Sequence, residues 1–124
     1  MIYVKVNDIK YPATVDGQMN DYSWDNRESK SITLTDTYDN VKTLFPDGIS
    51  WRIVVETENQ KYDENGNTVL DEAGNPVIVT TEEEFDNSDF SMSGPITDNR
   101  NGTCTIKMGK STDLEDAYEM LIGG

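Results

Sequence analysis

Alternation of apolar and polar residues, broken at short intervals by turn residues, is the feature that most limits what this chain can fold into. Apolar residues occupy positions 2, 4 and 6, and the turn pair Asn7-Asp8 follows them. A period of two residues is typical of a half-buried β-strand, and a turn pair between two such runs predicts a β-hairpin. We therefore expect residues 2 to 15 to form a hairpin.

Similar runs continue along the chain, and two other segments have the spacing of helices. Strands are predicted at residues 19–25, 29–35, 51–55, 77–79, 103–108 and within 85–96. A short helix is predicted to begin at Asp36 or Thr37 and to end at Pro46. A second helix is predicted after Thr112, because Thr112 and Glu115 have the spacing of a capping box. The apolar side of this second helix holds Leu114, Ala117, Tyr118 and Leu121.

The order of these elements predicts the fold class. Strands followed by helices, without regular alternation, favour an α+β fold. We expect a mainly antiparallel β-sheet, or a small β-barrel or sandwich built from hairpins, with a short mid-chain helix and a C-terminal helix. At 124 residues the chain has the common size of one domain, so we expect a single domain over residues 1–124.

Acidic residues are concentrated in one part of the chain. The 24 acidic and 10 basic residues give a net charge of −14. From Glu56 to Asp89 there are 11 acidic residues and one basic residue, Lys61, so the rest of the chain is close to neutral. Such a surface repels nucleic acid and anionic membranes and favours cationic partners. We expect an acidic, turn-rich insertion or hairpin at about residues 56–89, a protein partner with a basic surface, and no direct contact with nucleic acid or membrane.

A short internal repeat lies inside this acidic segment. Residues 63–70, DENGNTVL, are echoed by residues 71–78, DEAGNPVI. Asx-Gly turn chemistry in each copy predicts a protruding loop or hairpin, and two copies are too few for a solenoid.

The residues that commonly carry catalysis are scarce. The chain has no histidine, which excludes the commonest general base, the Ser-His-Asp arrangement and histidine-ligated metal sites. The one cysteine, Cys104, lies in an alternating segment and has no histidine partner, so we expect a buried thiol. We therefore predict a non-enzymatic protein with no catalytic residues and no cofactor.

Calcium binding is a weak hypothesis for the repeat. The candidate oxygen ligands, three of them in one-three-five spacing, are Asp63, Asn65, Asn67 and Asp71. An EF-hand also needs glycine at loop position six and glutamate at position twelve, and Thr68 and Gly74 stand there. A plain acidic loop is the favoured interpretation, and a weak calcium-binding module is the third of our functional hypotheses.

The densest acidic run gives the candidate partner-binding residues, which are Glu82, Glu83, Glu84, Asp86 and Asp89. A dense run of carboxylates can occupy the positions of nucleic-acid phosphates in the basic groove of a nucleic-acid-binding protein. The run therefore suggests an acidic nucleic-acid mimic, an anti-CRISPR-like inhibitor of a host defence or DNA-binding protein. The simpler interpretation is a charged strand edge that deters aggregation.

The sequence also bears on location. A single cysteine allows no internal disulfide, and the first residues lack the charged and apolar regions of a signal peptide. No apolar run approaches the roughly 20 residues that span a bilayer. We expect a soluble protein that is cytoplasmic, or part of a virion after assembly.

Several stretches of the chain resemble one group of proteins. These are the short hairpin opening, the DENGN…DEAGNP repeat, FDNSDFSMSGPITDNRNGT and the closing MGKSTDLEDAYEMLIGG. Together they resemble small, uncharacterised prophage-encoded proteins of Firmicutes, some of them encoded beside tail genes. The resemblance implies a virion-associated or tail-associated structural part, or a small accessory protein, and it brings no functional residues with it. The leading hypothesis is a phage-type structural or protein-interaction protein that can form a homo-oligomer in an assembly.

Overall fold

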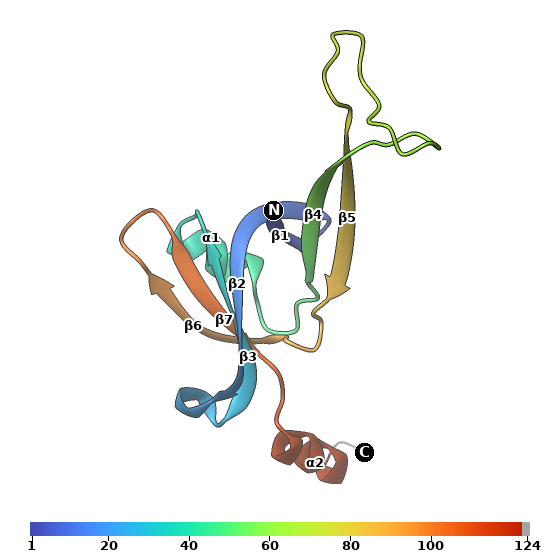
Figure 1. Ribbon diagram of the computed structural model, residues 1–124. Helices are drawn as coiled ribbons and strands as arrows, with labels where there is room; N and C mark the ends of the chain where they lie inside the picture. The colour runs from blue at the N-terminus through green and yellow to red at the C-terminus, as the bar shows by residue number, and fades with distance from the viewer. Residues whose placement is uncertain (123–124) are drawn as a thin grey trace.

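The computed structural model describes residues 1–122, which form one seven-stranded antiparallel sheet and two short helices (Figure 1). The elements in chain order are β1 (Ile2–Val6), β2 (Ile9–Asp21), the 3-10 turn η1 (Tyr22–Trp24), β3 (Arg27–Leu34), α1 (Tyr38–Leu44), β4 (Arg52–Gln60), β5 (Ile78–Asp86), β6 (Met92–Asp98), β7 (Cys104–Gly109) and α2 (Asp113–Ile122). The strand order is β5-β4-β1-β2-β3-β7-β6. The β-rich α+β prediction is confirmed. The sheet is open, with β5 and β6 as its edges, so closure into a barrel is not shown.

The long strand β2 joins the two halves of the sheet. Its first part pairs with β1, ending at Pro12 opposite Tyr3, and its second part pairs with β3, beginning at Ala13 opposite Leu34. A proline cannot donate a backbone hydrogen bond, so it is tolerated where a strand lacks a partner on one side. Pro12 lies at the point where β2 changes partner.

One face of the sheet encloses the core together with α1. Thr37 caps the start of the helix, and its hydroxyl accepts a hydrogen bond from the Asn40 amide at 3.2 Å. Phe45, just after α1, packs edge-on against Trp51 with ring centroids 6.0 Å apart. The Trp51 indole donates to the Phe90 carbonyl at 2.9 Å. The buried apolar residues of the core cluster are Val4, Val6, Ile32, Leu34, Val41, Phe45, Trp51, Phe90, Cys104, Ile106 and Met108.

A short connection brings the two edge strands together at one corner of the sheet. Residues 87–91 lead directly from β5 to β6, and they bond to the segment between α1 and β4. The Asn87 amide donates to the Trp51 carbonyl at 2.9 Å, and the Gly48 amide donates to the Ser91 carbonyl at 2.8 Å. The sheet is therefore held in a curved shape without closing.

The strand predicted at residues 19–25 is wrong in its second half. β2 ends at Asp21, and residues 22–24 form a 3-10 turn. The Asp21 carboxylate accepts a hydrogen bond from the Ser23 amide at 3.1 Å, which replaces the strand pairing. Asp25 and Asn26 then take left-handed backbone conformations that turn the chain into β3.

None of the helices within residues 1–122 has the length and apolar character needed to cross a membrane.

Candidate interaction site

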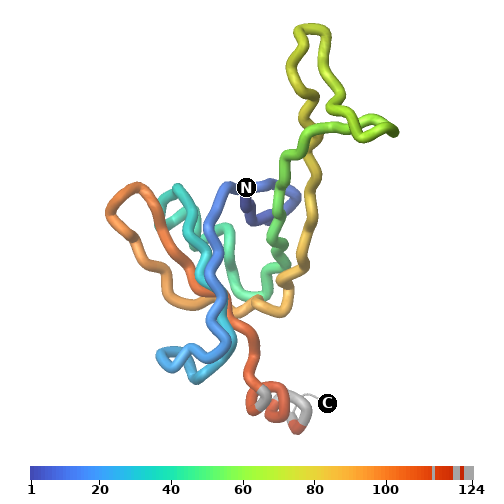
Figure 2. The backbone as a smooth tube through the Cα atoms, in the orientation of Figure 1, coloured from blue at the N-terminus to red at the C-terminus, as the bar shows by residue number. Residues whose placement is uncertain are grey.

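The β4–β5 hairpin projects beyond the rest of the sheet and forks at its tip (Figures 1 and 2). Past the last strand pair, Gln60 with Ile78, the chain forms two small hairpins, each closed by a single bridge. The bridges join Tyr62 to Thr68 and Leu70 to Pro76. We call residues 61–78, which end with the first residue of β5, the head.

The two hairpins of the head are copies of one structure. In the first, the Asp63 Oδ1 atom accepts hydrogen bonds from the amides of Asn65 and Asn67, both at 2.9 Å. The Gly66 amide donates to the Asp63 carbonyl at 3.0 Å, and Gly66 has a φ of 81°. Every one of these contacts recurs eight residues later, in the hairpin formed by Asp71, Ala73, Gly74 and Asn75. The sequence repeat therefore corresponds to a structural repeat.

A closed ring of three backbone hydrogen bonds joins these hairpins to the β4–β5 stem. The Lys61 amide donates to the Val77 carbonyl, and the Val69 amide donates to the Lys61 carbonyl, both at 2.8 Å. The Val77 amide donates to the Val69 carbonyl at 2.9 Å. Lys61, Val69 and Val77 follow one another at intervals of eight positions, and each lies at the base of one arm. The head is thus a three-way junction with approximate threefold symmetry, in which the stem is the third arm.

Three large apolar side chains occupy equivalent positions around this junction. Tyr62, Leu70 and Ile78 follow the three junction residues, and they are 59%, 56% and 52% exposed. We call them the apolar trio. Acidic residues stand beside them in both hairpins, namely Asp63, Glu64, Asp71 and Glu72. The head therefore presents apolar side chains among carboxylates, at a distance from the core.

The acidic run of β5 is only partly free. Glu82 forms an ion pair with Lys10, and Glu84 lies 3.0 Å from the Lys5 ammonium, both across the outer face of the sheet. The hydrogen bond from Lys5 lowers the pKa of Glu84. Val54, the strand partner of Glu84, is fully buried on this face, as expected where the aliphatic stems of long charged side chains lie over it.

The remaining candidates of this run lie apart from those ion pairs. Successive side chains of a strand point to opposite faces, so Glu83 points to the face opposite that of Glu82 and Glu84. The Asp86 carboxylate accepts hydrogen bonds from the amide and hydroxyl of Ser88, both at 3.0 Å, and the amide bond is the main reason that its pKa is lowered. Asp89 is exposed in the connection to β6. The five predicted residues therefore do not form one continuous free acidic surface.

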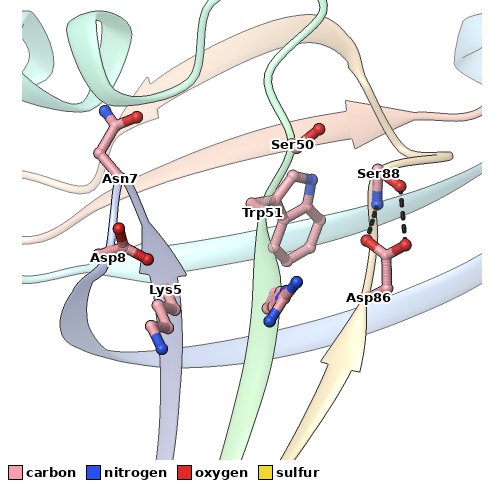
Figure 3. Close-up of a pocket in the computed structure, with 8 residues that line it drawn as sticks. Lys5, Asn7, Asp8, Ser50, Trp51, Asp86 and Ser88 are labelled. Carbon is pink, nitrogen blue, oxygen red and sulfur yellow. Dashed lines mark hydrogen bonds between the residues drawn. The ribbon is translucent and has the colours of Figure 1, made fainter.

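A polar hollow of about 390 Å³ lies at the other end of the β4–β5 pair (Figure 3). Its charged groups are two cations and two carboxylates, so its net charge is zero. Asp86 is held by Ser88, and its lowered pKa makes it a poor general base. Figure 3 shows the side chains that line the hollow, which are Lys5, Asn7, Asp8, Ser50, Trp51, Arg52, Asp86 and Ser88.

The calcium hypothesis gains no ligand cluster from the structure. One carboxylate oxygen of Asp63 is already bonded to two backbone amides, and Asp71 is bonded in the same way in the other hairpin. Asn65 and Asn67 use their backbone amides in that turn. Among the residues that the structure describes, no three Asp, Glu or Cys side chains are grouped so that they could hold a metal ion.

Cys104 lies in β7 and is buried in the core. Burial raises the pKa of its thiol, so the reactive thiolate is disfavoured.

No protein-family model, no curated protein and no solved structure matches the chain. The likeness to prophage proteins therefore stays a prediction.

The apolar trio was not singled out from the sequence, although a signal for it exists. Leu70 and Ile78 are the last residues of the two repeat copies, and Tyr62 stands at the same phase just before the first copy. An exposed apolar residue at the same place in each period is the pattern that indicates a shared surface.

Proposed function

We propose that this chain is a non-enzymatic interaction protein of a phage-type assembly, structural or accessory, that docks onto a protein partner through its head. The observation that carries the proposal is the apolar trio, whose three members are each more than half exposed. Large apolar and aromatic side chains supply most of the affinity in protein interfaces. The three-way junction places them at equivalent positions near the end of a projecting hairpin.

The charge around the trio indicates the kind of partner. Two Asp-Glu pairs lie in the hairpins next to the trio, and Lys61 is the one basic residue of the head. Carboxylates at the rim of an interface steer encounter with a cationic surface and hinder self-association of free chains. The partner we propose has an apolar recess bordered by Lys or Arg side chains, and it lies in the cytoplasm or in the virion.

An acidic nucleic-acid mimic remains the alternative function, and a calcium-binding module remains the third. The ion pairs of Glu82 with Lys10 and of Glu84 with Lys5 count against a mimic centred on β5. A mimic needs free carboxylates, and these two are already neutralised within the same face.

Affinity capture from the producing cells, at low and at high ionic strength, separates these functions. A trio variant combines Tyr62→Ser, Leu70→Ser and Ile78→Ser. A charge variant combines Glu82→Gln, Glu83→Gln, Glu84→Gln and Asp86→Asn. The matched control combines Ile9→Ser and Met19→Ser, two exposed apolar residues of β2.

The proposal predicts that a phage structural protein is captured by the wild type, the control and the charge variant, and is lost with the trio variant. Because burial of apolar side chains is insensitive to salt, capture should survive high ionic strength. Capture of a nucleic-acid-binding host protein that is lost at high salt and with the charge variant would favour the mimic. Equal capture by the wild type and the trio variant would refute docking through the head.

A further inference from the structure

The C-terminal helix α2 turns its apolar side to solvent. Leu114, Tyr118 and Leu121 follow one another at helical spacing and are 81%, 62% and 85% exposed. The capping-box spacing correctly predicted the helix. An amphipathic helix of a globular protein normally buries this side against the core, and α2 does not. In Figure 1 the helix lies below the sheet and away from it.

Polar contacts at its first turn hold α2 in place instead. Glu115 accepts two hydrogen bonds from the Arg27 guanidinium, at 2.7 and 2.9 Å. The Thr112 amide donates to Glu115 at 2.8 Å, and the Glu115 amide donates to the Thr112 hydroxyl at 3.2 Å, which completes the capping box. The bonds from Arg27 lower the pKa of Glu115 to about 2.

Arg27, which holds Glu115, is itself buried against the sheet. Arg27 is 3% exposed, and its guanidinium lies 4.9 Å from the centre of the Trp24 ring. Trp24 rests on two strand glycines: a Cβ added at Gly94 or Gly109 would stand 2.7 Å from its ring carbons. The sheet therefore makes room for the groups that fix α2, and the apolar side of the helix takes no part in holding it.

A hollow of about 770 Å³ continues the apolar side of α2 toward β6. Its walls include Met92 from β6 together with Leu114 and Tyr118 from the helix. The exposed apolar side of α2 and the hollow thus form one surface, which we call the α2 face.

We propose that the α2 face is a second docking surface, and that it binds a different protein that presents large apolar side chains among Lys and Arg side chains. The reason is charge. The sequence of α2 contains four acidic residues and no basic one, and Arg27 forms an ion pair with one of them, Glu115. Two copies of α2 packed together would bring two acidic segments close with no basic residue on either helix to offset them, which opposes a second copy as the occupant. The inference rests on the proposed function, an interaction protein, and adds a surface separate from the head.

Two synthetic peptides test this chemistry. One is an amphipathic helix of Leu and Lys, and the other is the same helix with Glu in place of every Lys. The proteins are the wild type, an α2 variant with Leu114→Ser and Leu121→Ser, the trio variant of the head, and the Ile9→Ser, Met19→Ser control. Binding is measured by isothermal titration, and the oligomeric state by sedimentation equilibrium. Because both substituted leucines are exposed, the α2 variant should fold, and circular dichroism checks this.

The expected result is that the Leu-Lys peptide binds the wild type, the control and the trio variant alike. The α2 variant should lose about tenfold or more in affinity, which corresponds to about 1.4 kcal/mol. The Leu-Glu peptide should not bind. Equal binding of the Leu-Lys peptide by the wild type and the α2 variant would overturn the inference, since the α2 face would then contribute nothing to binding. A dimer that the α2 variant abolishes would overturn it too, because the occupant would then be a second copy. In either case, docking through the head is tested separately, by affinity capture with the trio variant.

Discussion

Replacing Gly109 by alanine should destabilise the protein, although glycine-to-alanine changes in regular strands usually stabilise. An added Cβ would lie 2.7 Å from two ring carbons of Trp24 and from the Cδ atom of Arg27. Carbon atoms in contact are about 3.5–4.0 Å apart, so the ring or the arginine stem must move by about 1 Å. Overpacking of this kind costs about 1–3 kcal/mol, against about 0.4–1 kcal/mol gained from the stiffer unfolded chain. We expect a net loss of about 1–2 kcal/mol in the free energy of unfolding.

Gly17 supplies a matched control in the same sheet. A Cβ at Gly17 would meet no atom within 4 Å, and its φ lies outside the left-handed region. Gly17→Ala should therefore stabilise by about 0.4–1 kcal/mol, and the two variants should differ by about 2 kcal/mol. For a chain of this length that is a gap of about 8 °C in Tm, measurable by thermal and urea unfolding followed by circular dichroism. Shifts of the same sign and size in both variants would show that Trp24 does not rest on Gly109 in solution.

Three further predictions follow from the core, the head and the polar cluster beside η1. Hydrogen bonds from Lys107 and Ser23 lower the pKa of Asp21 to about 2, from an ordinary value of 3.8. Its contribution to stability is therefore present above about pH 4 and lost as the pH falls toward 2, so Asp21→Asn should flatten the acid limb of a plot of stability against pH. Gly66→Ala forces a side chain into the left-handed backbone region at a cost of about 1–2 kcal/mol. Because the head lies away from the core, this substitution should speed amide exchange in the head without moving the global unfolding midpoint. Phe45→Ala removes the partner of Trp51 from the core and should cost about 3–5 kcal/mol, seen as a lower urea midpoint.

The general fold was predictable because its information is local. Alternation in residues 2–6 and 104–108 predicted strands that the structure contains, and the capping box predicted where α2 begins. The strand predicted through Tyr22 and Trp24 failed because their spacing of two imitates a strand. The Asp21 carboxylate, which captures the Ser23 amide, decides the local conformation there.

The arrangement of the candidate surfaces depended on contacts between residues far apart in the chain. Lys5 and Lys10 neutralise acidic residues of β5 that lie more than 70 positions later, so charge counted along the sequence overstates the free charge of that run. Arg27 is likewise 88 positions from Glu115, and no local pattern predicts that the helix is held by its polar first turn. The repeat predicted a protruding loop or hairpin, whereas the structure forms one small hairpin from each copy. The three-way junction was not predicted, because it needs Lys61 to meet Val77.

The head and the α2 face share one chemistry, because each presents three large apolar side chains among carboxylates. Figure 1 places them at opposite ends of the sheet. A chain with a net charge of −14 repels its own copies, so neither surface is expected to be covered by self-association of free protein. If each surface binds a cationic partner, the chain can join two proteins that need not touch each other. Binding at one end also lowers the net negative charge of the complex, which weakens the repulsion between neighbouring copies. Assembly would then proceed only after a partner has been bound, which suits a part that must stay dispersed until a growing structure recruits it.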